Sequence, residues 1–194
     1  IIGNTAGGDG GGVYHSSGDD VLNDVLMENG GDIGDNTATG NGGGIFMSGA
    51  GNLSIANANL YRNEAANGGG IHKTNGDDSS ITYTSIRENT ASADGGGLWL
   101  SGVTVDFDKT TVRQNYAATN GGGFYIDGGT VTLNTSTVSS NGVDPDDDTI
   151  RTNQGGGFFQ NSGTVSLNNS TVAHNESDGT AGYRKAGGTT ELFS

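Results

Sequence analysis

One short pattern recurs along the chain, and this repetition constrains the fold more than any other feature. Three consecutive glycines followed by an apolar residue occur six times, at residues 10–13, 42–45, 68–71, 95–98, 121–124 and 155–158. Each motif is preceded by an asparagine, at Asn4, Asn36, Asn63, Asn89, Asn115 and Asn141. From Asn36 to Asn141 the asparagines are 27, 26, 26 and 26 residues apart. A period of this length is typical of a solenoid, in which each repeat packs only on its neighbours.

Apolar residues within each repeat alternate with polar ones, as β-strands require. Three positions before the asparagine stand Leu60, Ile86, Val112, Val138 and Val172. Eight positions before it stand Ile55, Ile81, Phe107, Leu133 and Leu167, and ten before it Leu53, Val105, Val131 and Val165, with Ser79 as the exception. The residue after the glycines forms a fourth apolar column. These columns predict the core of a stack of coils.

The period and the alternation together predict a right-handed parallel β-helix. About seven coils of roughly 26 residues, with three strands per coil, would form one domain over residues 1–194. We expect insertions near residues 14–35 and 142–154, and an irregular C-terminal coil over 176–194. Residues 20–29 are the one stretch with helical spacing of apolar residues, and they predict a short helix that caps the first coil.

Composition removes several classes of protein. There are 38 glycines but one proline, so the chain is not collagen-like. The net charge of −14 argues against nucleic acid and against an anionic membrane surface as partners. No cysteine is present, and no apolar run reaches transmembrane length. Only 30% of residues are hydrophobic, so folding depends on the order in which those residues recur.

The asparagine and glycine columns have structural explanations. Asparagine tolerates the left-handed backbone region, and stacked asparagines can hydrogen-bond to one another. Glycine permits positive φ and close approach of backbones. We therefore predict a structural asparagine ladder, formed by Asn36, Asn63, Asn89, Asn115 and Asn141.

The repeat resembles those of the polymorphic outer-membrane protein family and related bacterial β-helix surface proteins. Those repeats pair an FxxN-type element with a GGA[ILV]-type element. The matching FxxN-type tetrapeptides here are residues 60–63, 86–89, 112–115, 138–141 and 172–175, each with an aliphatic first residue, and glycine replaces alanine in the other element. The resemblance implies a secreted, surface-displayed prokaryotic protein used for adhesion or coat-building.

A column of flat rings is the most informative candidate site. The second residue after each triple glycine is Tyr14, Phe46, His72, Trp99, Tyr125 or Phe159. Alternation places this column outside the core, with one ring per coil about 4.8 Å apart. Exposed aromatics mark contact sites for a glycan, a protein or another copy of the chain, and stacked rings also stabilise neighbouring coils.

The second candidate site is the acidic insertion. Asp144, Asp146 and Asp148 alternate along it, and oxygen ligands at that spacing can wrap a calcium ion. Thr149 stands where an EF-hand has glycine, and the closing glutamate is missing, so a solvated acidic loop is the alternative. Calcium is the only cofactor that the sequence suggests.

Catalysis and ice binding are the minor alternatives. Asp106 and Asp108 are the best carboxylate pair for glycoside hydrolysis, since they share a face of one strand about 7 Å apart. Ser and Thr fill much of the fourth and fifth positions before the asparagine, a pattern that resembles ice-binding faces. We expect instead a non-enzymatic structural or adhesive protein that contacts itself or a surface glycan or protein, possesses no membrane insertion, and assembles into fibres or a coat. A carbohydrate-binding or carbohydrate-cleaving module is the runner-up.

Overall fold

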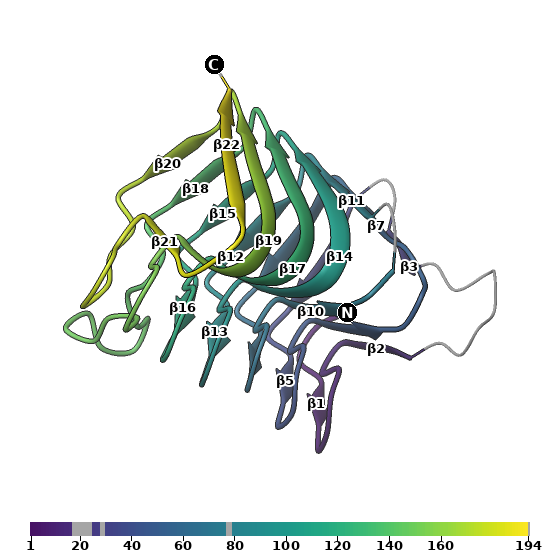
Figure 1. The fold of residues 1–194 in the computed structure, drawn as a ribbon. Helices are drawn as coiled ribbons and strands as arrows, with labels where there is room; N and C mark the ends of the chain where they lie inside the picture. The colour runs from purple at the N-terminus through teal and green to yellow at the C-terminus, as the bar shows by residue number, and fades with distance from the viewer. Residues whose placement is uncertain (17–24, 28–29, 77–78, 194) are drawn as a thin grey trace.

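The computed structural model is an all-β parallel solenoid, which confirms the predicted fold class (Figure 1). It describes residues 1–16, 25–27, 30–76 and 79–193. Every strand pair between named strands in these residues is parallel, and each strand pairs with the equivalent strand of the next coil. Six coils are complete enough to contribute a strand to the six-stranded sheet, and a partial coil follows them.

Three sheets run along the solenoid axis. The five-stranded sheet contains β1 (Thr5–Ala6), β5 (Thr37–Ala38), β9 (Glu64–Ala65), β13 (Thr90–Ala91) and β16 (Tyr116–Ala117). The six-stranded sheet contains β4 (Gly31–Gly34), β8 (Ala58–Tyr61), β12 (Ser85–Arg87), β15 (Thr111–Arg113), β18 (Thr137–Ser139) and β20 (Thr171–Ala173).

The eleven-stranded sheet changes its construction along the chain. In the first three coils each turn contributes two short strands: β2 (Val13–Ser16) and β3 (Val25–Met27), β6 (Ile45–Ser48) and β7 (Leu53–Ala56), and β10 (Ile71–Thr74) and β11 (Ser79–Thr82). In the next three coils the two merge into β14 (Leu98–Asp108), β17 (Phe124–Asn134) and β19 (Phe158–Asn168). Strands β21 (Tyr183–Lys185) and β22 (Thr189–Phe193) then pair with the two halves of β19.

The predicted helix over residues 20–29 is wrong where the structure describes it. Val25–Met27 is strand β3, which pairs in register with Leu53–Ile55 of β7. Parallel pairing with the next coil satisfies its backbone groups, and this outweighs a helical spacing of apolar residues. The remaining residues of that prediction, 20–24 and 28–29, lie outside the described residues.

The core fills the inside of the coil with the predicted columns. The residue after the triple glycine is fully buried in five coils, namely Ile45, Ile71, Leu98, Phe124 and Phe158. The columns three, eight and ten positions before the asparagine supply Leu60, Ile81, Val105 and their equivalents to the same cluster. Ser79, the exception among them, is buried and accepts a hydrogen bond from the backbone N–H of Leu53 at 3.1 Å.

Candidate functional site

The regular spacing of asparagines produces a continuous hydrogen-bonded ladder at one corner of the coil. Asn63 Nδ2 donates to Asn89 Oδ1 at 2.9 Å, and Asn89 Nδ2 donates to Asn115 Oδ1 at 2.9 Å. The backbone N–H of each asparagine donates to the same oxygen in the next coil. The second Nδ2 bond reaches a core-strand carbonyl of the preceding coil, as from Asn89 to Leu60 at 3.1 Å. The predicted ladder residues Asn36, Asn63, Asn89, Asn115 and Asn141 are all 0% exposed, so their amides serve the scaffold.

The ring column forms a second ladder. Successive rings from Tyr14 to Phe159 are stacked, with planes within 16° of parallel and centroids between 4.3 and 5.9 Å apart. The closest pair is His72 and Trp99, at 4.3 Å and 3°. Register pairing of β2, β6, β10, β14, β17 and β19 places one ring directly over the next.

The expectation that all six rings are exposed is wrong for two of them. Tyr14 is 59% exposed, but Phe46 is 8% and His72 is 6% exposed. Trp99, Tyr125 and Phe159 are half-buried. Alternation correctly excludes these side chains from the core cluster. It does not predict exposure, because each ring of a tight stack covers its neighbours on both sides.

Stacking changes what the ring ladder can bind. A sugar ring packs against the face of an aromatic ring, and inside this ladder each face already contacts another ring. The two end rings, Tyr14 on β2 and Phe159 on β19, each have one ring neighbour, and Phe159 lies in register with Arg184 of β21. The ladder therefore offers ring edges along its length and ring faces only at its two ends.

His72 is the only histidine in this stack, and it is uncharged at neutral pH. Burial between Phe46 and Trp99 lowers the pKa of His72 to about 4, and the nearby Asp9 carboxylate opposes this only in part. Its Nδ1 atom is buried without a hydrogen-bond partner among the described residues.

A further polar ladder, which our sequence reasoning missed, lies at the glycine corner. Its members stand directly before each triple glycine: Asp9, Asn41, Asn67, Asp94, Asn120 and Gln154. Asn67 Nδ2 donates to Asn41 Oδ1 at 2.9 Å, and Asn120 Nδ2 donates to Asp94 Oδ1 at 3.0 Å. Burial raises the pKa of Asp94, while its bonds from Asn120 act in the opposite direction. The signal was present, because every member is Asp, Asn or Gln.

The acidic insertion uses its carboxylates within its own turns. Asp144 Oδ1 accepts the backbone N–H of Asp146 at 2.9 Å, and Asp147 accepts the N–H of Thr149 at 3.0 Å. In the part of the chain that the structure describes, no three His, Cys, Asp or Glu side chains converge in a metal-binding arrangement. Asp144, Asp146 and Asp148 thus lie on one loop without forming a common site in this conformation.

The loop instead borders a pair of grooves beside the asparagine corner. One groove of about 470 Å³ lies among Asp35, Thr37, Arg62, Glu64, Glu88, Thr90, Pro145 and Asp146. A second, of about 510 Å³, shares Glu88 and Pro145 and is bordered by Asp144 and Asp148. Most of the charged groups here are acidic, and Arg62 is paired with Asp35 at 2.7 Å.

A family model described as the right-handed beta helix region matches residues 1–144. The chain belongs to this family. No curated protein and no solved structure matches it. The match supports a β-helix protein in general, and it does not confirm the narrower polymorphic outer-membrane resemblance. Right-handed β-helix domains occur both in enzymes, such as pectate lyases, and in non-enzymes, so membership alone assigns no activity.

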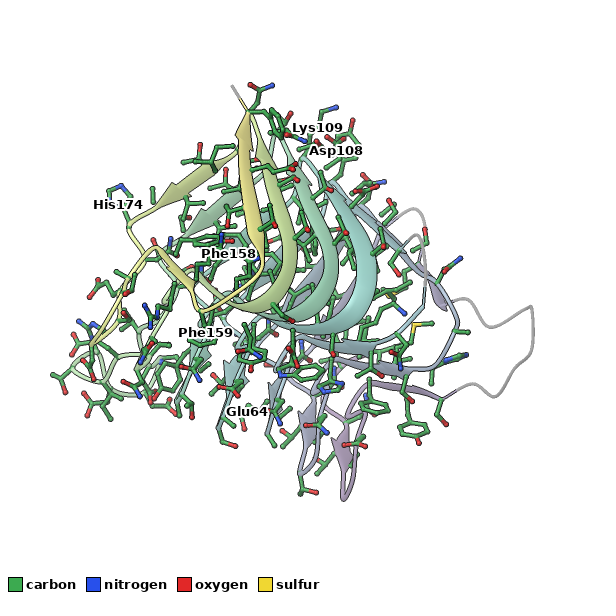
Figure 2. The ribbon with its side chains drawn as sticks, viewed as in Figure 1. Glu64, Asp108, Lys109, Phe158, Phe159 and His174 are labelled. Carbon is green, nitrogen blue, oxygen red and sulfur yellow. The ribbon has the colours of Figure 1, made fainter. Side chains whose placement is uncertain are left out.

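The carboxylate pair suggested for catalysis lies away from the grooves of this β-helix. Figure 2 shows Asp108 and Glu64 at opposite corners of the cross-section, with Lys109 beside Asp108. Lys109 Nζ approaches the Asp108 carboxylate at 3.8 Å, and Asp106 is exposed on the outer face of β14. Neither aspartate lines any of the grooves described above. An exposed pair of this kind lacks the walls that hold a polysaccharide.

The Ser and Thr columns do not form a common outer face on this β-helix. The fifth position before the asparagine points inward: Thr84, Thr110 and Ser136 are at most 3% exposed. Thr110 Oγ1 donates to the carbonyl of Ile81 at 3.0 Å, and Ser136 Oγ accepts the N–H of Thr110 at 3.1 Å. An ice-binding face needs outward hydroxyl groups, so this column cannot contribute to one. The described residues also include no helix long and apolar enough to cross a membrane.

Proposed function

We propose that this β-helix is a structural or adhesive protein displayed outside a prokaryotic cell, where it acts as a rigid rod. The observation that carries the proposal is the set of ladders along the axis. The asparagine and ring ladders pass from coil to coil through the first six coils and occupy amides and ring faces that a ligand would need. The similarity of the repeats to bacterial surface proteins supports the location.

The first and last coils of the described β-helix carry most of its exposed large apolar side chains. Seven large hydrophobic side chains are exposed among the described residues, and five of them belong to the first and last coils: Ile1, Ile2, Tyr14, Leu192 and Phe193. Along the sides, acidic groups predominate and the net charge is −14, which keeps parallel rods apart. Stacking of a second copy on an end coil would bury apolar surface and continue the strand pairing.

Sedimentation velocity over a range of concentrations, combined with negative-stain electron microscopy, tests this function. We expect species longer than one solenoid, joined end to end. The double variant Leu192→Asp, Phe193→Asp should abolish them by charging one end. Ile150→Asp is the matched control, since Ile150 is 44% exposed on the acidic insertion rather than at an end. Single rods at every concentration would contradict self-assembly and leave a glycan or protein as the partner.

The same measurement in millimolar calcium tests the metal prediction. Calcium binding would use carboxylate oxygens of Asp144, Asp146 and Asp148, and the bond from the Asp146 N–H occupies only Oδ1 of Asp144. An assembly that depends on calcium and disappears in Asp144→Asn would support a metal role for the loop. Identical assembly with calcium and with a chelator would contradict it.

A further inference from the structure

Asparagine followed by glycine is the dipeptide most prone to spontaneous deamidation, and this chain contains six such pairs. Their asparagines are Asn29, Asn41, Asn67, Asn75, Asn120 and Asn141. The glycine backbone nitrogen attacks the asparagine Cγ atom, which requires that nitrogen and the amide side chain to move freely. A fold that holds both groups in hydrogen bonds protects the pair.

Four of the pairs are held in this way. The N–H groups of Gly42, Gly68, Gly121 and Gly142 donate to backbone carbonyls of the next or the preceding coil at 2.8 to 3.1 Å. The side chains are also bonded: Asn41 and Asn67 pair with each other, Asn120 bonds Asp94, and Asn141 bonds Asn175 and the Val112 carbonyl. The scaffold ladders therefore remove the freedom that the reaction needs. Asn29 lies outside the described residues.

Asn75 is different in each respect. It follows β10 in the loop where the eleven-stranded sheet is interrupted, and it is exposed with a φ of 57°. Its own N–H donates to Ser101 at 2.8 Å, but its side chain and the N–H of Gly76 make no hydrogen bond to the described residues. Gly76 has a φ of 91° and lies outside the strands, so the nucleophilic nitrogen belongs to a residue in irregular backbone.

We propose that Asn75–Gly76 is a deamidation site built into the fold. The Gly76 nitrogen bonds to Asn75 Cγ, the Cγ–Nδ2 bond breaks, and ammonia leaves with the Gly76 amide proton. Water then opens the five-membered imide at either carbonyl. Opening at the side-chain carbonyl gives aspartate, and opening at the main-chain carbonyl gives isoaspartate with a free α-carboxylate.

The buried Lys73 favours the isoaspartyl product. Its Nζ atom, on a side chain that is 0% exposed, donates to the Asn75 carbonyl oxygen at 3.0 Å and to the Gly51 carbonyl at 2.8 Å. Opening the imide at that main-chain carbonyl converts the oxygen beside the ammonium into part of a carboxylate. The contact between the Lys73 ammonium and a neutral carbonyl then becomes an ion pair between ammonium and carboxylate. Because the ammonium is shielded from water, the attraction between the two charges is strong.

Peptide mapping by mass spectrometry tests the site. The folded protein is incubated at mildly alkaline pH, and conversion is followed at Asn41, Asn67, Asn75, Asn120 and Asn141. We expect Asn75 to react at least about tenfold faster than the other four asparagines. A tenfold ratio of rates requires only a modest difference in activation free energy. In concentrated urea the five rates should become similar, because only the folded state distinguishes them. Equal rates in the folded protein, or faster reaction at a ladder asparagine, would overturn the proposal.

The product ratio tests the part assigned to Lys73. The isoaspartate-to-aspartate ratio at residue 75 should be higher in the folded protein than in urea, and an equal or lower ratio would overturn that role. Asn75→Gln is the control variant, since the exposed side chain keeps its polarity while the longer amide cyclises far more slowly. It should retain the melting temperature and abolish conversion at this position.

Discussion

The second and third coils cross the eleven-stranded sheet differently from the fourth and fifth coils, and the two kinds of coil differ in length there by one residue. In the coils of β6–β7 and β10–β11 the stretch from the glycine corner to the next turn is one residue longer than β14. There it breaks into two strands joined by a loop. In β14 and β17 the strand continues, and glycines with positive φ absorb the bend, as at Gly102 with φ 59°.

The break changes the chemistry of the core beneath it. A loop turns backbone carbonyls toward the interior without sheet partners, and buried carbonyls need donors. Lys73 supplies donors to two of the interrupted coils, through the carbonyls of Gly51 and Asn75. In the continuous strands β14 and β17 the equivalent inward positions are the apolar Leu100 and Ile126, whereas β19 has the buried Gln160, whose Nε2 donates to the Gly163 and Thr189 carbonyls. The buried Lys73 thus has a structural role as the donor to these two loop carbonyls.

Substitution in the asparagine ladder should lower the free energy of unfolding most, and the loss should be equal in interrupted and continuous coils. Asn63→Ala and Asn115→Ala each remove the bonds of a fully buried amide and leave its partners unpaired, at about 4 kcal/mol of unfolding free energy. Urea titration measures this, with the exposed Asn59→Ala as control at under about 0.5 kcal/mol. A clearly smaller cost at Asn63 would show that the interrupted coils are loosely held throughout.

Lys73→Met should have the next largest effect and should be confined to the interrupted coils. The methionine fills the space but leaves the Gly51 and Asn75 carbonyls without the Lys73 donor. We expect the free energy of unfolding to fall by about 3 kcal/mol. Leu100→Met, in the continuous coil beside it, conserves volume and should cost under about 1.5 kcal/mol. Equal losses in the two variants would contradict the role assigned to the ammonium.

In the interrupted coil of β10, His72 of the ring ladder should make a smaller contribution to stability that depends on pH. Because burial lowers the folded-state pKa of His72 to about 4 from an ordinary value of 6.5, the unfolded chain binds a proton first as pH falls. Stability is complete above pH 6.5 and should decrease by about 2 kcal/mol between pH 7 and pH 5. His72→Phe keeps the stack and should remove that part of the pH dependence, which thermal melts at both values would reveal. An unchanged pH profile in the variant would assign the loss to other groups.

The fold could be predicted because each repeat carries the same information. The glycine triplets, the asparagines and the alternating columns agree on one coil, and six repetitions exclude helical alternatives. The prediction of a capping helix is wrong at Val25–Met27 because it rested on apolar spacing alone. Pairing with β7 decides that segment, and no local pattern encodes such a partner.

The candidate site was predicted less completely. Column spacing placed Tyr14 and Trp99 in one ladder, but it could not show that stacking would bury Phe46 and His72. The polar ladder through Asn67 and Asp94 had a readable signal that was overlooked beside the more regular asparagines. Whether the acidic residues of the 142–154 insertion converge depends on loop conformation, which spacing does not determine.

By itself, the sequence determined the period, the fold class and the residues of each core column, since these follow from repetition and from the two-residue alternation of a strand. Only the tertiary structure decided which rings are buried, which carbonyls Lys73 satisfies, and which of the described Asn–Gly pairs has neither its side-chain amide nor its glycine N–H bonded to the described residues. Those properties depend on contacts between coils and on single-residue differences in loop length, and a side chain's surroundings in a solenoid come mainly from the coils on either side of it.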